Sequence, residues 1–192
     1  MSDYVTLYKA MKETFQNEYK ERSPLYKERI VKWGTEPPIV RIDGPTNIAR
    51  ARELGYKAKQ GVVMARVQVL GGKSKRVMFS GGRKPSKRGM YFTRQKSGQS
   101  IAEERAGRRF TNCEVLNSYF VGQSGSTKFY EVILIDRGSP VVQSDPGLRA
   151  VLSQRNRAAR GLTRSGRKHR GLRMKGFGTA RFRPSKRANN RS

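Results

Sequence analysis

The stretch VVMARVQVL, residues 62–70, is the clearest structural signal in this chain of 192 residues. Its odd-numbered positions hold valine or alanine, and these alternate with Met64, Arg66 and Gln68. A two-residue period of this kind is typical of a β-strand that buries one face. We therefore predict a strand over residues 62–70, with Met64, Arg66 and Gln68 on its other face.

Upstream of this strand, the chain predicts three helices and one more strand. Ser2 is a candidate N-cap, and apolar residues from Tyr4 to Phe15 recur at the spacing of an amphipathic helix. Stripes of this type usually belong to a core, so we expect this helix to pack on the body. The other upstream elements are a helix from Ser23 to Gly34, a strand over Ile39–Ile42 and a helix over Thr46–Leu54 that stops at Gly55.

Downstream, a capping-box pattern at Ser100–Glu103 predicts a helix that continues to about Phe110. Glu104 and Arg108 form an i,i+4 ion pair on this helix. The later elements are a hairpin of the strands Val115–Val121 and Phe129–Ile135, joined by residues 122–127, and a short helix from Asp145 to about Gln154.

The order of these elements indicates an α+β fold, with a small, mostly antiparallel sheet covered by helices. To this are added a long basic loop and a basic C-terminal extension. We divide the chain into N-terminal helices (residues 1–35), an α+β body (residues 36–154) interrupted by the basic loop (residues 71–99), and a basic tail (residues 155–192).

The positive charge of the chain is concentrated in two segments. The formal net charge is +28, from 42 Lys and Arg against 14 Asp and Glu. Residues 54–102 contain twelve basic residues and no acid, and residues 146–192 contain fifteen basic residues and no acid. The rest of the chain is nearly neutral. Such a field needs an anionic polymer beside it, so we predict a nucleic-acid partner rather than a metabolic enzyme.

The first acid-free segment contains the basic loop. Glycine pairs at residues 71–72 and 81–82 argue against regular structure, and nine Lys or Arg lie between Lys73 and Lys96. Each of them can neutralise a phosphate and release condensed counterions. Tyr91 and Phe92 lie close to the end of this segment, and an aromatic ring beside cations can stack on an exposed base. The other interpretation, which we prefer for Phe92, is that the ring pins the loop to the core.

The tail has few apolar residues and a strong arginine bias. From Pro146 onward it holds twelve Arg and three Lys, and the planar guanidinium binds phosphates in a bidentate manner and stacks on bases. We expect this segment not to fold alone but to become ordered on its partner. Removal of Arg155–Ser192 should then leave a folded body with weaker RNA binding. A solvated basic tail used for targeting is the alternative.

Residues 54–61, with the sequence LGYKAKQG, form a cationic junction between the helix predicted over Thr46–Leu54 and the strand predicted over residues 62–70. Tyr56, Lys57 and Lys59 lie there between two glycines. Close approach of the backbone to a phosphate chain and a plain turn with exposed lysines are equally open interpretations.

The residues do not support an enzyme or a metal site. Gly72-Lys73-Ser74 matches the end of a phosphate-binding loop, but Val67 stands where that motif needs a glycine. His169 is the only histidine and Cys113 the only cysteine, so neither a catalytic triad nor a cysteine cluster can be assembled. We predict no catalysis, no metal, no cofactor and no small-molecule substrate. Short apolar runs and the lack of a signal-peptide pattern predict a cytoplasmic protein without membrane contact.

Six short sequence blocks follow one another along the chain: Leu54–Gly61, Ala102–Arg108, Leu116–Tyr119, Glu131–Asp136, Arg160–Thr163 and Arg170–Leu172. In sequence and order they resemble the ribosomal protein fifteen-e family of archaeal and eukaryotic large ribosomal subunits. The chain length is closer to that of the archaeal members. The resemblance implies a structural protein of the cytoplasmic ribosome, without catalysis or cofactor. It also implies a body and extensions that bind large-subunit ribosomal RNA beside neighbouring ribosomal proteins.

Two sets of residues are candidate RNA contacts. The family blocks and their immediate continuation supply the first set: Tyr56, Lys57, Lys59, Gln60, Arg105, Arg108, Arg160, Arg164, Arg167, Lys168, Arg170 and Arg173. The acid-free segments and the helix before residue 110 supply the second set: Arg66, Lys73, Lys75, Arg76, Arg83, Lys84, Lys87, Arg88, Arg94, Lys96, Arg109, His169 and Lys175. Because A-form RNA presents shape more than readable base edges, we expect contacts mainly to phosphates and 2′-hydroxyl groups.

The alternative function is that of a DNA-compacting protein of chromatin or of a nucleoid. Such a protein needs the same charge but prefers broad grooves and repetitive contacts. Co-sedimentation with chromatin or with the large ribosomal subunit separates the two hypotheses.

Overall fold

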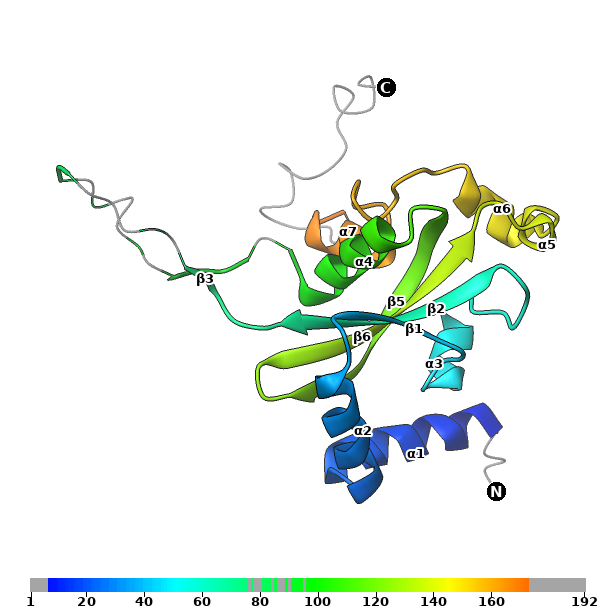
Figure 1. Cartoon of the computed structure of the whole chain (residues 1–192), viewed down its shortest axis with the longest axis horizontal. Coiled ribbons are helices and arrows are strands. Elements are labelled where there is room, and N and C mark those ends of the chain that lie inside the picture. Colours follow the sequence, from blue (N-terminus) through cyan, green and yellow to red (C-terminus); the bar gives the residue numbers. More distant parts are fainter. Residues whose placement is uncertain are drawn as a thin grey trace.

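The structure is a computed structural model, which describes residues 7–75, 77, 81–83, 85, 89, 91–94 and 96–172. Within these residues it has a four-stranded sheet with helices on both faces, and a separate two-stranded ribbon (Figure 1). In chain order the elements are α1 (Leu7–Glu21), α2 (Pro24–Thr35), β1 (Ile39–Ile42), α3 (Ile48–Glu53), β2 (Val62–Leu70), β3 (Ser74–Lys75), β4 (Tyr91–Phe92), α4 (Gly98–Arg109), β5 (Cys113–Ser124), β6 (Thr127–Asp136), α5 (Pro140–Gln143), α6 (Pro146–Leu152) and α7 (Arg164–His169).

Strand β2 lies in the middle of the sheet, and its bounds are those that its alternation predicts. The strand order is β1-β2-β6-β5, and every neighbouring pair is antiparallel. The pairing of β2 with β6 runs from Val62 opposite Ile135 to Leu70 opposite Thr127, which is the whole length of β2. The prediction of an α+β fold with a small antiparallel sheet is therefore confirmed.

Helix α4 covers one face of the sheet. Its Ala102 and Ala106 are fully buried and lie in one hydrophobic cluster with Val67, Val69 and Val132 of the two central strands. Alanine at these positions lets the helix approach the sheet closely, while the larger valines fill the space between them. The side of α4 that faces away from this cluster is thereby left to polar residues.

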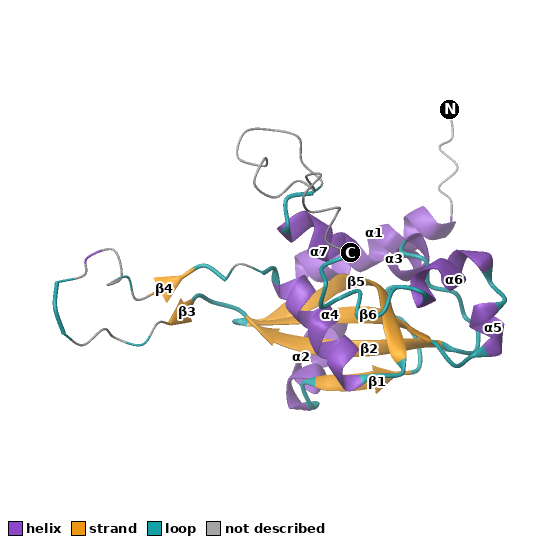
Figure 2. Ribbon diagram, turned by 90° about the horizontal axis from the view of Figure 1, so that it is seen from above, coloured by secondary structure: helices purple, strands orange, loops and turns teal. Residues whose placement is uncertain are grey.

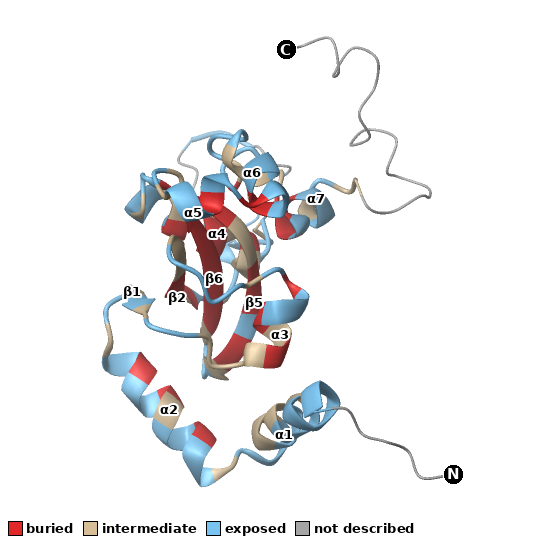
Figure 3. Cartoon of the chain, turned by 90° about the vertical axis from the view of Figure 1, so that its right-hand side faces the viewer, coloured by how far each residue is buried: buried red, intermediate tan, exposed pale blue. Residues whose placement is uncertain are grey.

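Helices α2 and α3 cover the opposite face (Figures 1 and 3). The cluster there includes Trp33 of α2, Ala51 of α3, and Met64, Phe129 and Ile133 of the sheet. Met64 is almost completely buried, so β2 buries side chains on both faces. The expectation that only one face of β2 is buried is therefore wrong, because a second helical layer covers the other one.

Helix α1 is less buried than its apolar stripe predicts. None of its residues is classed as buried, and Leu7, Tyr8 and Met11 are 72%, 45% and 37% exposed. Phe15 and Tyr19, nearer the C-terminal end of the helix, are partly buried against the α2–α3 side of the sheet. The first two turns of α1 therefore present apolar side chains on the surface (Figure 3).

The end of the sheet is closed by the short helices α5 and α6. Val142 and Leu148 form a small cluster with Ile135 at the end of β6. Asp145 is the N-cap of α6, as predicted, because its carboxylate accepts a 3.1 Å hydrogen bond from the Gly147 amide. None of the helices in the described parts of the chain is long and apolar enough to cross a bilayer.

Helix α4 begins earlier than the capping-box pattern predicts. Ser97 is its N-cap, and the Ser97 hydroxyl accepts a 3.2 Å hydrogen bond from the Ser100 amide. Ser100 itself is buried inside the first turn. The predicted box at Ser100–Glu103 is therefore wrong, because the Glu103 side chain turns toward β5 instead of back to the helix end.

The β5–β6 hairpin is longer than predicted. The strands continue to Ser124 and from Thr127, so that two residues form the turn, and Gly125 adopts a positive φ of 52° there. β5 also shifts its register against β6 between Val115 and Asn117 and again between Phe120 and Gly122. Each shift places one extra residue on β5, which is the mark of a β-bulge and bends the strand locally.

Candidate nucleic-acid interface

The solvent face of α4 carries a row of arginines. Arg105, Arg108 and Arg109 are exposed, since the alanines at positions 102 and 106 occupy the side that faces the sheet. The side chain of Arg108 is 79% exposed and lies 4.0 Å from Glu104, four residues earlier. The predicted i,i+4 pair is thus present at the limit of ion-pair distance, and most of the guanidinium stays open to solvent.

Helix α7 lies beside α4 and extends this cationic surface (Figure 1). The Thr163 side chain caps α7 by accepting a 3.1 Å hydrogen bond from the Gly166 amide. Buried Ser165 is 3.3 Å from Ser97, the N-cap of α4. Arg164, Arg167 and Lys168 are exposed on the other side of this short helix. We call α4 and α7 with their exposed basic residues the α4–α7 surface.

The packing of α7 corrects the expectation that the tail does not fold alone. Ala158, Thr163 and Ser165 are buried against the body, and Ala158 belongs to the same hydrophobic cluster as the α4 alanines. The tail is rich in small residues, which reach the core without any large apolar side chain. Residues 156–170 are therefore part of the folded body.

Two buried carboxylates hold this segment. Glu103 accepts hydrogen bonds of 2.5 Å from the hydroxyls of Ser118 and Thr163. Glu114 accepts a 2.9 Å bond from the backbone amide of Asn156 and a 3.4 Å bond from that of Arg157. Burial raises the pKa of Glu103, and the two hydroxyl donors partly oppose this rise. Both acids lie inside the fold, so they stabilise the tail without reducing the positive charge outside it.

The outer edge of β5 is covered by one side chain of the tail and one of α4. Arg157 donates to the backbone carbonyls of Val115 and Leu116 at 2.6 and 3.3 Å. Gln99 of α4 donates to the Ser118 carbonyl at 2.8 Å. Arg157 was not among the predicted residues of interest, and in the sequence it resembles any other arginine of the tail. Its role in covering the β5 carbonyls becomes apparent only from the structure, in which the tail lies against the edge of the sheet.

The basic loop begins as an antiparallel ribbon that projects from the sheet (Figures 1 and 2). Ser74 pairs with Phe92 and Lys75 with Tyr91, so the base of the loop has regular structure despite the glycine pairs. Tyr91 is 62% and Phe92 37% exposed, and the Phe92 ring lies against Gly89, where an added Cβ would come within 2.7 Å of its Cζ atom. The interpretation of Phe92 as a pin to the core stays a prediction.

A cavity of about 400 Å³ lies where the ribbon meets the body. Lys73, Arg94, Lys96 and Lys128 are among its lining residues, and no carboxylate lines it within the described part of the chain. Arg94 also donates to the Leu70 carbonyl at 2.9 Å, which fixes its side chain at the base of the ribbon. Lys128 was missed because it stands in the neutral part of the sequence. Its pairing opposite Val69 brings it next to the loop.

At the junction before β2, the two lysines contact an acid. Lys57 and Lys59 lie 2.6 and 3.2 Å from the carboxylate of Asp145, and half of each lysine side chain stays exposed. These two donors lower the pKa of Asp145 to about 2. Tyr56 is half-buried against the α2–α3 side, and Gln60 is exposed. Both lysines are exposed, as the plain-turn interpretation expects, and both are paired with Asp145. Close approach of this junction to a phosphate chain stays a prediction.

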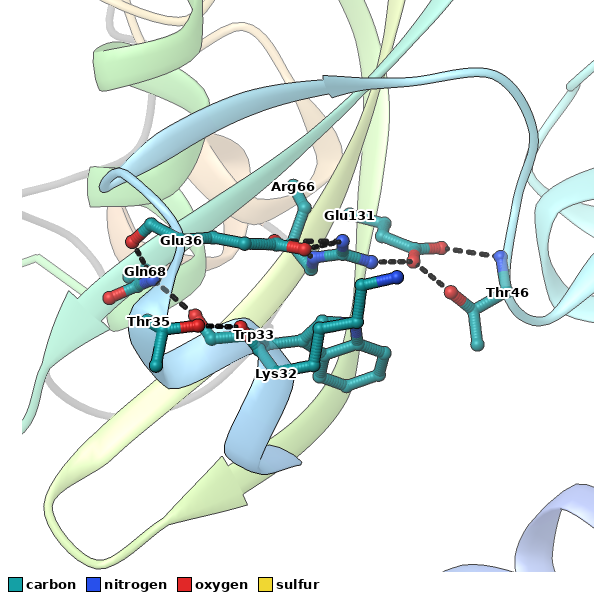
Figure 4. A network of polar contacts seen from close by, with 8 residues as sticks. All are labelled: Lys32, Trp33, Thr35, Glu36, Thr46, Arg66, Gln68 and Glu131. Atoms are coloured by element: carbon teal, nitrogen blue, oxygen red, sulfur yellow. Dashed lines mark hydrogen bonds and ion pairs between the residues drawn. The ribbon is translucent and has the colours of Figure 1, made fainter. Parts of the chain in front are cut away.

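Arg66, another candidate contact, is enclosed by side chains of the body. Its guanidinium makes bonds of 2.8 to 3.1 Å with the Glu36 carboxylate, lies 3.9 Å from Glu131 and packs 4.6 Å from the centre of the Trp33 ring (Figure 4). Glu131, which is fully buried, also accepts hydrogen bonds from Thr46. Only 11% of the Arg66 side chain is exposed, because these groups enclose it. It connects α2 to the sheet and is not available to a nucleic acid.

The remaining candidates fall into four groups. Lys73, Lys75, Arg83, Arg160 and Arg170 are exposed, whereas His169 is half-buried. Lys96 is exposed but is bound to Glu104 at 2.6 Å. The following candidates lie outside the described residues: Arg76, Lys84, Lys87, Arg88, Arg173 and Lys175.

Comparison with known proteins assigns the chain to one family along nearly its whole length. The model of a family described as Ribosomal L15 matches residues 6–189, which include the first acid-free segment and all but the last three residues of the second. The chain belongs to the ribosomal L15e family. A large ribosomal subunit protein eL15 from Methanocorpusculum labreanum is 49% identical over 159 residues, and the match covers 82% of each chain. The protein of the same description from Methanocella arvoryzae is 48% identical over 170 residues, which is 87% of each chain.

The match to the L15e family spans all of the residues that the structure describes. The matched region contains the sheet, the ribbon, the α4–α7 surface and the α1–α2 pair. The two relatives are archaeal, which agrees with the expectation drawn from the length of the chain.

Proposed function

We propose that the chain is a structural constituent of the large ribosomal subunit, which binds and scaffolds ribosomal RNA in the cytoplasmic ribosome. The observation that carries the proposal is the α4–α7 surface of an L15e family member. Exposed arginines cover its outside, while the neighbouring acids Glu103 and Glu114 are buried beneath it. A folded patch of this kind binds a phosphate backbone in a fixed orientation.

The proposed mechanism has a rigid part and an extended part. The α4–α7 surface docks on helical RNA, and the β3–β4 ribbon reaches away from it with Lys73 and Lys75 exposed. Each phosphate that a Lys or Arg neutralises releases counterions, so affinity decreases steeply as salt concentration rises. The body thus sets the position of the ribbon and of the tail, and these in turn screen the repulsion between closely packed RNA helices. Neighbouring ribosomal proteins complete the surroundings.

Of the candidate contacts, we propose that the exposed residues of the two acid-free segments and of α4 bind RNA. Lys57 and Lys59 do so after exchanging Asp145 for a phosphate. Arg66 is left out, since Glu36 and Glu131 occupy its guanidinium. The chain needs no catalytic group for this role, as is usual for a structural protein.

Sedimentation of the tagged full-length chain from a cell extract tests the function. The proposal requires that the chain migrates with the large ribosomal subunit in a gradient that separates subunits from chromatin. Migration with chromatin, or with neither fraction, would refute it. The first of these outcomes would support the DNA-compacting alternative instead.

A matched pair of double variants tests the surface. R164A/R167A removes two exposed arginines of α7, and K27A/K32A removes two exposed lysines of α2. Each lost phosphate contact reduces the slope of log affinity against log salt by about 0.7 to 0.9. We expect R164A/R167A to reduce the slope by roughly one to two and K27A/K32A to leave it unchanged. Equal effects of the two variants would mean that only total charge matters.

A further inference from the structure

We propose that an open aromatic cavity between α1 and β5, on the face of the sheet opposite α4, binds a single unstacked nucleotide of RNA. This inference rests on the proposed function, because the ligand is a part of the RNA that the chain scaffolds. It concerns a site that neither of the acid-free segments contains.

The cavity has an apolar floor made of aromatic rings. It measures about 500 Å³, and its floor includes Phe15 and Tyr19 of α1 and Phe120 and Val121 of β5. Pockets of about 300 to 1,000 Å³ are typical of small-molecule sites, so a nucleoside fits. Phe120 is 37% exposed although it lies in a sheet strand. A flat ring that is open on one side is the usual support for a stacked base.

The rings of the floor are held in place before any ligand arrives. Tyr19 meets Phe120 edge to face at 5.7 Å and Tyr26 at 5.6 Å. Phe120 meets Tyr130 in the same manner at 5.8 Å, and the Arg22 guanidinium lies 5.0 Å from the centre of the Tyr19 ring. Because these contacts fix the rings, binding does not have to order them, and less of the interaction free energy is lost.

The rim of the cavity has the charge of an anion site. Lys12, Lys20 and Arg50 line it, and no carboxylate does so within the described residues. Lys12 and Arg50 share one acid, Glu53, at 3.1 and 2.5 Å, so the rim stays net positive. Gln16 lies on the same side of α1 as Lys12 and Lys20, at four-residue spacing, and supplies an amide.

These properties together favour a nucleotide over a protein segment. An acidic peptide would use the cations but has no flat group for the rings, and an apolar helix would use the rings but bury the cations. A nucleotide satisfies both, since its base stacks on Phe120 while its phosphate reaches Lys20 or Lys12. Paired bases in a duplex cannot enter, so the ligand is a nucleotide in a loop, a bulge or a single strand.

Photo-crosslinking with a defined probe tests the site in the full-length chain. The probe is a single-stranded decamer of RNA with one 4-thiouridine, and the crosslinked residues are mapped by mass spectrometry. We expect crosslinks to α1 or to residues 119–121 with the single strand and none there with the same probe in a duplex. Absence of such crosslinks overturns the inference. If crosslinks to the α4–α7 surface still form, the proposed function is unaffected.

Two variants and a control make the test quantitative. K20A removes an exposed rim cation, and F120L keeps the floor apolar but removes the ring. K27A removes an equally exposed lysine from α2. Stacking contributes enough for about a tenfold loss of crosslinking at this site in F120L, with a smaller loss in K20A and none in K27A. Crosslinks that persist in both F120L and K20A would contradict the inference. A thermal melt of F120L shows whether the variant is folded, and K20A gives the answer if it is not.

A fluorescent decapeptide of glutamate is the probe for a protein ligand. The nucleotide site requires that this peptide does not reduce crosslinking at α1 and residues 119–121 at concentrations where a decamer of unlabelled RNA does. Competition by the peptide that depends equally on Lys20 and on Phe120 would assign the cavity to an acidic protein segment and overturn the inference.

Discussion

The carboxylate of Glu103 on α4 accepts a 2.5 Å hydrogen bond from the hydroxyl of Thr163, sixty residues later in the chain. Both side chains are buried, and Thr163 is also the N-cap of α7. Together with the contact between Ser97 and Ser165, this bond connects α4, which faces the sheet, with α7, which continues its cationic surface. The carboxylate of Glu103 therefore holds the two helices of the α4–α7 surface together, and it is buried out of reach of any ligand.

Two truncations separate the docked part of the tail from the rest. A chain that ends at Leu172 keeps every anchor of residues 156–170, and we expect its melting temperature to equal that of the full chain. A chain that ends at Gln154 leaves Glu103 and Glu114 without their partners in the tail, and buried groups without partners cost about 1–3 kcal/mol each. We expect it to be strongly destabilised in a denaturant titration. Equal stability of the two truncated chains would show that the tail is only an appendage.

The Glu103–Thr163 bond can be tested by T163V. Valine keeps the shape of threonine but cannot donate to Glu103 or cap α7, so we expect a loss of about 1–3 kcal/mol in the free energy of unfolding. The variant T93V serves as the control, because Thr93 is exposed at the base of the ribbon. A loss in T93V as large as that in T163V would mean that the hydroxyl at 163 has no special role.

Burial also gives the stability a pH dependence. It raises the pKa of Glu103 and of Glu131 above their ordinary value of 4.5, so the folded chain retains these protons to higher pH than the unfolded chain does. The free energy of unfolding therefore decreases as pH rises above 4.5 through the folded-state pKa values. E103Q removes one of the two groups, and denaturant titrations from pH 4.5 to 8 should show a smaller decrease for it. An unchanged decrease would contradict this assignment.

The opposite sign applies to Asp145. Its pKa is lowered to about 2, from 3.8 in the absence of partners, so its contribution to stability is present above pH 3.8 and is lost as the pH falls toward 2. At neutral pH, D145N releases Lys57 and Lys59 for phosphates. We expect a severalfold gain in RNA affinity and a steeper salt dependence in a filter-binding titration. D43N changes the net charge equally at an exposed acid directly after β1, and a similar gain there would attribute the effect to charge alone.

Arg66 and Arg108 should behave in opposite ways. R66M leaves the buried Glu131 and the half-enclosed Glu36 without their cation, and loss of one partner of a buried pair costs about 3–5 kcal/mol. We expect low stability but normal RNA affinity for the fraction that stays folded. R108A should retain the melting temperature and weaken RNA binding. Reduced affinity of folded R66M, measured well below its melting temperature, would restore Arg66 as a contact.

Much of the sheet could be predicted because residues 62–70 alternate with a period of two and the other strands are short apolar runs next to turn residues. β1 and β2 have the predicted bounds, and both strands of the hairpin were placed within three residues at each end. The second buried face of β2 could not be predicted from its own residues. Met64 looks like any residue of a polar face until α2 and α3 cover it.

Helix α7 could not be predicted because its burial involves Thr163, Ser165 and glycine instead of a large apolar stripe. Its stability comes from Glu103, which is distant in sequence and lies in a pattern that also fits a helix cap. The candidate contacts were predicted from charge alone, and charge does not distinguish an exposed arginine such as Arg108 from an enclosed one such as Arg66. Lys128 shows the reverse case, since strand pairing and not composition brings it to the base of the ribbon.

The side chains that cover the edge of β5 also affect how the chain behaves before it binds any partner. β5 lies at the border of the sheet, and a long border strand offers its backbone to strands of other molecules. Arg157 and Gln99 occupy the carbonyls of Val115, Leu116 and Ser118, and two bulges bend the strand. Addition of another strand to this part of β5 is therefore hindered. We expect the tail segment that contains Arg157 to reduce edge-to-edge aggregation of the newly made chain.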